Sequence, residues 1–122
     1  MSHLVNSGDA GFAGAMLAAA RRHVEEAGVV VLERYPPGWV VDCTDSVHEA
    51  DGVRYVFRVI DRTAGVLTAV VRYEFDGAAA EQTFTARDLD DARLSTLASR
   101  ARLRPALHLD DAGTLVVLRT TA

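Results

Sequence analysis

The spacing of apolar residues predicts a helix near the start of the chain and a pair of strands after it. Apolar side chains recur at helical intervals over residues 12–27, and Gly28 follows as a residue that can end a helix. Two runs rich in β-branched residues, 29–32 and 39–41, then flank a Pro36-Pro37-Gly38 segment. Pro followed by Gly is typical of a type II turn, so we expect these two runs to form a hairpin.

The clearest strand pattern lies in the middle of the chain. Every second residue is apolar over 53–59 and again over 67–75, which predicts a long antiparallel hairpin with one apolar face. Residues 82–86 are expected to add a third strand to it. The segment before the hairpin, residues 42–52, is polar and ends in Asp51-Gly52, so it is expected to be a loop.

The last third of the chain predicts a second helix followed by a hairpin. Leucine and alanine recur at helical spacing over residues 89–102, and Pro105 follows as a residue that cannot continue a helix. Two short apolar segments, 107–109 and 114–118, then flank the turn-forming residues 110–113.

Grouped strands with two helices favour an α+β fold over the strict alternation of a parallel α/β fold. We therefore expect an N-terminal helix, about five mostly antiparallel strands, a second helix and a C-terminal hairpin, with the helices packed on one face of a twisted sheet. A chain of 122 residues has the common size of one domain. Residues 1–122 are accordingly predicted to form a single α+β domain, with residues 1–8 flexible.

Composition and charge limit the classes of function. Apolar residues make up 49% of the chain and charged residues 25%, as in an ordinary globular protein. The net charge is −4, so the molecule as a whole repels a phosphate backbone, and nucleic acid is not the expected partner. All 13 basic residues are arginine, which fits a coding bias. No apolar run has the length of a membrane span, no secretion signal is visible, and the single cysteine, Cys43, cannot form an internal disulfide. A cytoplasmic location is expected.

Potential metal ligands are present, but none completes a recognisable site. The densest group lies in the polar segment and comprises Asp42, Asp45, His48 and Glu49. The group lacks the alternating ligands and central glycine of a calcium loop, so a solvated acidic segment is the favoured interpretation. No nucleophile motif and no phosphate-binding or dinucleotide-binding loop is visible. The sequence therefore predicts no catalytic residue, metal or cofactor, and enzymatic activity is not favoured.

Aromatic and basic side chains provide two further groups of candidates. The first group could line a pocket between sheet and helices, although such rings are equally typical of a core. Its members are Trp39, Tyr55, Tyr73 and His23. The second group could contact an anion or a partner, although basic residues at the end of a helix also offset its dipole. Its members are Arg100, Arg102 and Arg104.

One face of the central hairpin mixes basic and apolar side chains. The residues concerned are Arg54, Val56, Arg58, Ile60, Val70 and Arg72. A face this apolar is expected to be buried against another surface, and burial against a second copy of the chain would explain it. The pattern therefore favours a homodimer or another protein partner.

Three segments of the first half carry a family resemblance. Residues 18–34, Val41-Asp42 and residues 51–57 together resemble the opening of small PD-(D/E)xK, restriction-endonuclease-like proteins. The resemblance implies that Asp42 is the first carboxylate of a Mg²⁺ site. The second motif is absent, because residues 58–61 supply neither its Glu nor the Lys that helps to activate water. An inactive relative is therefore implied.

These observations favour a non-catalytic protein-interaction module, such as an adaptor, chaperone, immunity or regulatory subunit, that acts through its sheet face. Two alternatives stay open. One is a small-molecule-binding or enzymatic domain with a pocket between sheet and helices. The other is an inactive nuclease-like protein that binds nucleic acid.

Overall fold

Antiparallel sheets and a few helices make up the part of the chain that a computed structural model describes, residues 6–9 and 11–121. The elements follow in the order α1 (Phe12–Arg22), β1 (Val29–Glu33), α2 (Trp39–Asp42), β2 (Ser46–Ala50), β3 (Val53–Thr63), β4 (Val66–Phe75), β5 (Ala78–Arg87), α3 (Asp91–Arg100), β6 (Leu103–His108) and β7 (Leu115–Thr120). The predicted α+β class and the predicted order of helix, strands, helix and hairpin are confirmed. None of the described helices is long and apolar enough to cross a membrane.

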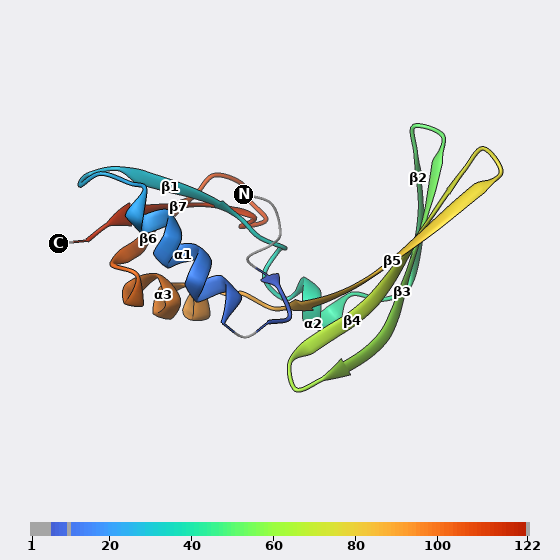
Figure 1. The fold of residues 1–122 in the computed structure, drawn as a ribbon, viewed down its shortest axis with the longest axis horizontal. Helices are drawn as coiled ribbons and strands as arrows, with labels where there is room; N and C mark the ends of the chain where they lie inside the picture. Colours follow the sequence, from blue (N-terminus) through green and yellow to red (C-terminus); the bar gives the residue numbers. More distant parts are fainter. Residues whose placement is uncertain (1–5, 10, 122) are drawn as a thin grey trace.

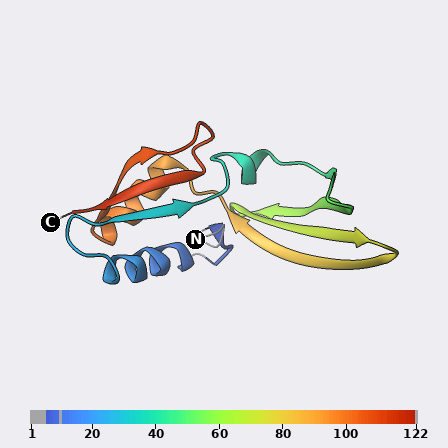
Figure 2. The same cartoon turned by 90° about the horizontal axis from the view of Figure 1, so that it is seen from above.

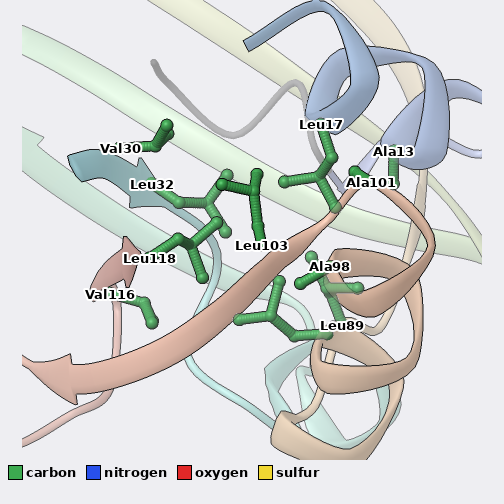
Figure 3. Packing of buried hydrophobic residues seen from close by; sticks show 11 residues of the cluster. Ala13, Leu17, Val30, Leu32, Leu89, Ala98, Ala101, Leu103, Val116 and Leu118 are labelled. Atoms are coloured by element: carbon green, nitrogen blue, oxygen red, sulfur yellow. The ribbon is translucent and has the colours of Figure 1, made fainter. Parts of the chain in front are cut away.

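The first strand and the last two strands form one sheet, in the order β1-β7-β6 with antiparallel pairing throughout. Helices α1 and α3 pack on one face of this sheet (Figure 1). Figure 3 shows the interior between them, where Leu32, Leu103 and Leu118 of the strands meet Leu17 of α1 and Ala98 of α3. These side chains are at most 1% exposed, so the hydrophobic effect holds the two ends of the chain together here.

The four middle strands form a second sheet, in the order β2-β3-β4-β5. This sheet is long and curved and extends away from the first (Figures 1 and 2). The predicted hairpin of β3 and β4 and the predicted third strand, β5, are confirmed. Asp76 and Gly77, which join β4 to β5, have φ angles of 49° and 77°, the positive values that a type I′ hairpin turn requires. The strands are thus divided between two sheets, where the sequence predicted one.

The predicted hairpin between residues 29–32 and 39–41 is wrong, because the second run forms the short helix α2. Pro36 and Pro37 have no backbone N–H and cannot extend a ladder. The chain turns instead at Gly38, whose φ is 88°, and the N–H of Trp39 donates to the carbonyl of Pro36 at 2.9 Å. This turn buries Val40 in a second hydrophobic cluster with residues of β4 and β5.

The predicted loop over residues 42–52 is also partly wrong, because Ser46–Ala50 forms the edge strand β2. Its residues pair in register with β3, from Ser46 opposite Phe57 to Ala50 opposite Val53. Most of β2 is exposed on both faces. Backbone pairing with β3, and not burial of side chains, keeps β2 in the sheet. Because its sequence is polar, β2 has no alternation of apolar and polar residues by which a strand could be predicted.

Helix α3 begins with a side-chain cap. Asp90 has extended backbone, and its carboxylate accepts a hydrogen bond from the N–H of Arg93 at 2.8 Å. Replacing Asp90 by Ala is expected to lower the free energy of unfolding by about 1 kcal/mol, because an N–H of the first turn loses its acceptor. Chemical denaturation followed by circular dichroism measures the change. Asp111→Ala, in the exposed turn after β6, is the control and should leave stability within about 0.5 kcal/mol; equal losses would contradict the capping role.

Arg34 joins the end of β1 to two other elements. Its side chain is fully buried, and its guanidinium donates to the carbonyl of Gly113 at 2.8 Å and to the carbonyl of Leu89 at 2.8 Å. A third bond, of 2.6 Å, reaches the carboxylate of Asp91 at the start of α3. One side chain therefore fixes the β6–β7 turn, the entry to α3 and the exit from β1 relative to one another.

Candidate binding pocket

A pocket of about 620 Å³ lies on the face of the four-stranded sheet against which α2 packs. Its lining comes from α2 and the segment before it, from β3, β4 and β5, and from the start of the described chain. The lining residues are Asn6, Ser7, Tyr35, Trp39, Phe57, Val71, Tyr73, Gln82, Phe84, Thr85 and Ala86. A volume of this size is typical of small-molecule sites.

The register of the sheet places several of these residues side by side. Phe57 of β3 lies opposite Val71 of β4, and Val71 lies opposite Gln82 of β5. Side chains on a strand alternate between faces, so the sequence alternation that predicted an apolar face also predicted which residues share it. The polar Gln82 joins this row because it stands two residues from Phe84 on the same strand.

Aromatic rings form most of the apolar wall. Tyr35 and Trp39 are stacked, with ring centroids 4.5 Å apart, and Trp39 lies 5.7 Å from the ring of Phe57. Phe57 in turn lies 6.3 Å from Phe84. The rings thus form a continuous surface from α2 across β3 to β5, and such a surface can pack against the face of a flat or ring-shaped ligand.

The beginning of the described chain closes one side of the pocket. Asn6 is buried, and its amide donates to the carbonyl of Arg87 at 2.8 Å while its oxygen accepts from the N–H of Tyr35 at 2.9 Å. Ser7 forms an isolated bridge with Ala86, and Arg87 donates to the carbonyl of Gly8 at 2.9 Å. Of the residues 1–8 that the sequence predicted to be flexible, 1–5 lie outside the described part of the chain, whereas Asn6 is firmly bonded.

The polar groups of the pocket are neutral. The hydroxyl of Tyr73 donates to the side-chain oxygen of Gln82 at 3.2 Å. Burial raises the pKa of Tyr35, with smaller contributions from Cys43 and Tyr73, so its phenol stays protonated near neutral pH. Among the described residues that line the pocket there is no carboxylate, imidazole, thiol or basic side chain. These residues can therefore stack, hydrogen-bond and orient a ligand, but none of them would act as a base at neutral pH.

The structure separates the four aromatic and imidazole candidates. Trp39 and Tyr73 line the pocket. Tyr55 does not line it but meets Tyr73 edge to face, with centroids 5.6 Å apart. His23 follows α1, which packs on the other sheet. The sequence did not predict that Asn6, Ser7 and Thr85 line the pocket. Their place in the lining depends on contacts between distant parts of the chain.

The candidate metal ligands do not gather. Asp42 ends α2, and the carboxylate of Asp45 accepts a hydrogen bond from the N–H of Val59 at 2.8 Å. His48 and Glu49 are neighbours on β2 and so point to opposite faces of the sheet. Across residues 6–9 and 11–121 no three His, Cys, Asp or Glu side chains form a group that could hold a metal ion.

The arginine-rich groups occupy other surfaces. Arg100, Arg102 and Arg104 are exposed around the end of α3 and the start of β6, and an anion contact there stays a prediction. The mixed face of the central hairpin lies opposite the pocket. On it, Arg54 lies 4.0 Å and Arg72 3.8 Å from the carboxylate of Glu74. Arg72 also lies 3.4 Å from Glu81 of β5, so this face carries ion pairs both along β4 and across to its neighbouring strands.

Comparison with known proteins identifies the fold. No protein-family model and no curated protein matches the chain. Among solved structures, an S-adenosylmethionine-dependent methyltransferase from Clostridium acetobutylicum matches with a TM-score of 0.76 at 13% identity, over 98% of this chain and 56% of that one. The sugar N-methyltransferase KedS8 from Streptoalloteichus matches with 0.69 at 20% identity, over 100% and 54%. The amino pentose methyltransferase CalS10 from Micromonospora echinaspora matches with 0.66 at 21% identity, over 98% and 55%. The chain shares their fold and spans about half their length.

These matches correct the interpretation of the sequence. The restriction-endonuclease-like resemblance was wrong, since the matched structures named above are methyltransferases. Asp42, which that resemblance implied to be the first carboxylate of a Mg²⁺ site, lies at the end of helix α2 and not at the end of a strand. The prediction of a non-catalytic interaction module with a homodimer or another protein as partner was also wrong, because the three matched structures named above are those of methyltransferases that act on small molecules or bind S-adenosylmethionine. The mixed face of the central hairpin, which includes Arg58 and Val70, prompted the prediction of a protein partner. The ion pairs described above neutralise part of the positive charge on this face.

Proposed function

We propose that this chain provides the acceptor-binding part of a methyltransferase, and that the aromatic pocket holds the small molecule that receives the methyl group. The observation that carries this proposal is the pocket of about 620 Å³ with a continuous wall of rings, on a fold shared with methyltransferases. This function corresponds to one of the two alternatives that the sequence left open, a small-molecule-binding or enzymatic domain with a pocket between sheet and helices.

The lining indicates the kind of molecule. Stacked rings such as Tyr35 and Trp39 pack against the apolar face of a ring, while Gln82 and the hydroxyl of Tyr73 offer hydrogen-bonding groups. The absence of charged side chains from the described lining disfavours a strongly anionic acceptor, whose charge would be desolvated without a partner. A sugar or amino sugar ring satisfies these conditions, and sugars are named as the substrates of two of the matched enzymes.

S-adenosylmethionine itself does not fit the described residues. Dinucleotides and related cofactors are held where parallel strands end, by a glycine-rich turn between a strand and a helix and by an acidic residue that binds the ribose. All strand pairing in the described part of the chain is antiparallel. Gly52, Gly65 and Gly77 lie in strand-to-strand turns, and the described lining of the pocket includes no acidic residue for the ribose hydroxyls.

Acceptor binding can be tested with the chain alone, because its one tryptophan, Trp39, lines the pocket. Titration with an amino pentose, an amino hexose and a neutral hexose is expected to change Trp39 fluorescence saturably for at least one of them. Tyr73→Ala should then raise the Kd about tenfold, because a ring contact worth roughly 1.4 kcal/mol is lost.

Phe75→Ala provides the matched control for the pocket. Phe75 lies on the same strand and the same face as Tyr73, but it is 57% exposed and does not line the pocket. Its replacement should leave the Kd unchanged. No fluorescence change with any of the three sugars, or equal effects of Tyr73→Ala and Phe75→Ala, would count against the acceptor role. We further propose a cytoplasmic location, which agrees with the single unpaired thiol of Cys43.

A further inference from the structure

Two arginines face each other on neighbouring strands of the three-stranded sheet. Arg104 of β6 and Arg119 of β7 are register partners, and both residues are exposed. Leu103 and Leu118, which precede them in the chain, are buried under α1 and α3. Because side chains on a strand alternate between faces, both arginines lie on the face away from the helices. Residues directly opposite in an antiparallel pair have Cβ atoms about 5 Å apart, so the two positive charges share one small area.

The four-stranded sheet arranges its arginines differently. There Arg72 of β4 has Glu81 of β5 as its register partner, and the two side chains form an ion pair. In the part of the chain that the structure describes, neither Arg104 nor Arg119 forms an ion pair or a side-chain hydrogen bond. Like charges directly opposite each other destabilise a sheet. An anion bound between the two guanidinium groups would remove this repulsion.

Neither a helix dipole nor a nearby carboxylate on this face accounts for the pair. Arg100 lies in the last turn of α3, where a positive charge offsets the dipole, but Arg104 and Arg119 belong to strands and point away from the helices. The strands β1, β6 and β7 contain one acidic residue, Glu33. Glu33 is four residues along β1 from Val29, the register partner of Arg119. Four residues of strand span about 13 Å, which exceeds the distance over which salt screens exposed charges.

Apolar side chains border the pair on the same face. Val29 lies opposite Arg119 on the side away from Arg104, and it is 47% exposed. The next row of this face contains Val117 of β7 and Leu107 of β6, which are register partners. A molecule with an anionic group and an apolar body could therefore contact the arginines and the apolar row together.

We propose that Arg104 and Arg119 bind the phosphate group of a phosphate monoester, whose apolar part lies against Val29 and Val117. The planar guanidinium fork matches the oxygens of a phosphate, and two such forks face one site here. A phosphate monoester carries a charge of about −1.5 to −2 at pH 7, which balances two arginines. Figures 1 and 2 place this end of β7 at the tip of the molecule farthest from the four-stranded sheet. The site is therefore separate from the aromatic pocket and does not depend on the proposed function.

Calorimetric titration of the isolated chain at low ionic strength tests the proposal with three anions. Phenyl phosphate is expected to bind saturably, and inorganic phosphate should bind more weakly because it has no apolar part. Benzenesulfonate has the same ring but a single negative charge, so its Kd should be about fivefold higher than that of phenyl phosphate. No heat of binding with phenyl phosphate, or equal affinities for phenyl phosphate and benzenesulfonate, would overturn the proposal. The sugar titration followed by Trp39 fluorescence reports separately on the acceptor role.

Glutamine substitutions locate the site. Arg104→Gln and Arg119→Gln should each raise the Kd for phenyl phosphate about tenfold, because charge-assisted hydrogen bonds to the phosphate are lost. Arg58→Gln is the control, since Arg58 is an exposed arginine on β3 of the other sheet and its loss changes the net charge equally.

Stability distinguishes lost binding from unfolding. Arg104→Gln removes one of two like charges, so the midpoint of its chemical denaturation should be equal to or above that of the unaltered chain. A lower midpoint would contradict the repulsion between Arg104 and Arg119. Equal losses of phenyl phosphate binding for Arg58→Gln and Arg104→Gln would show attraction to positive charge in general and would overturn the site.

Discussion

Replacing Arg34 by Met is expected to lower the free energy of unfolding by about 3 kcal/mol, because two buried carbonyl groups lose their hydrogen-bond donor. Met keeps most of the length of the side chain but has no donor. The carbonyls of Leu89 and Gly113 both accept from Arg34 at 2.8 Å and both belong to buried residues. Each buried acceptor that loses its donor costs roughly 1–3 kcal/mol. Chemical denaturation followed by circular dichroism measures the sum.

Asp91→Asn separates the two buried carbonyls from the ion pair. Asp91 is 65% exposed on its side chain, so solvent screens its interaction with Arg34, and the loss on substitution should stay below about 1 kcal/mol. The hydrogen bond from Arg34 holds the pKa of Asp91 below its usual range. This contribution is therefore complete above the unfolded carboxyl pKa and is lost as the pH falls through the lower folded pKa. Equal losses for the two variants, or a loss below 1 kcal/mol for Arg34→Met, would contradict the structural role of the two carbonyl bonds.

Arg34 also illustrates what the sequence could not reveal. Its partners are contributed by the loop before α3 and by the β6–β7 turn, so nothing near it in the chain marks it as buried. Arginine is rarely buried without partners, and a sequence reading takes it as exposed by default. The same holds for Asn6, whose partners are Tyr35 and the carbonyl of Arg87.

Local patterns, by contrast, predicted much of the second sheet. Alternation over 53–59 and 67–75 located β3 and β4 and the face they share, because one side of the sheet is covered by α2 and the other is exposed. The pairs Asp51-Gly52 and Asp76-Gly77 identified hairpin turns, since glycine tolerates the positive φ values found there.

Strand pairing between the ends of the chain was not predictable in this way. Residues 29–32 form a strand, as expected, but their partner is β7 and not the run after the prolines. The apolar pattern of β1 suits burial on both faces and does not specify which strand pairs with it. Of the residues that line the pocket, the sequence predicted Trp39 and Tyr73. It did not predict Asn6 and Ser7, which close one side of the pocket.

Leu118→Ala is expected to cost about 3 kcal/mol, because Leu118 is fully buried at the centre of the β1-β7-β6 sheet and truncation leaves a cavity beside Leu32 and Leu103. Leu109→Ala is the matched control. Leu109 is 55% exposed beyond the end of β6, so its truncation should change stability by less than about 0.5 kcal/mol. Equal losses for the two leucines would contradict the placement of the core.

The same variant tests whether residues 1–122 unfold as one domain. Leu118 belongs to the cluster under α1 and α3, whereas Trp39 packs against the separate cluster of Val40, Leu67, Ala69 and Ala86. Circular dichroism reports on both sheets, and fluorescence reports on the surroundings of Trp39. The bonds of Arg34 and Asn6 tie the exit of β1 to α3 and to the end of β5, so we expect both signals to shift to lower denaturant together. A loss confined to circular dichroism, with Trp39 fluorescence unchanged, would show that the four-stranded sheet and its pocket fold independently of the sheet that carries β1.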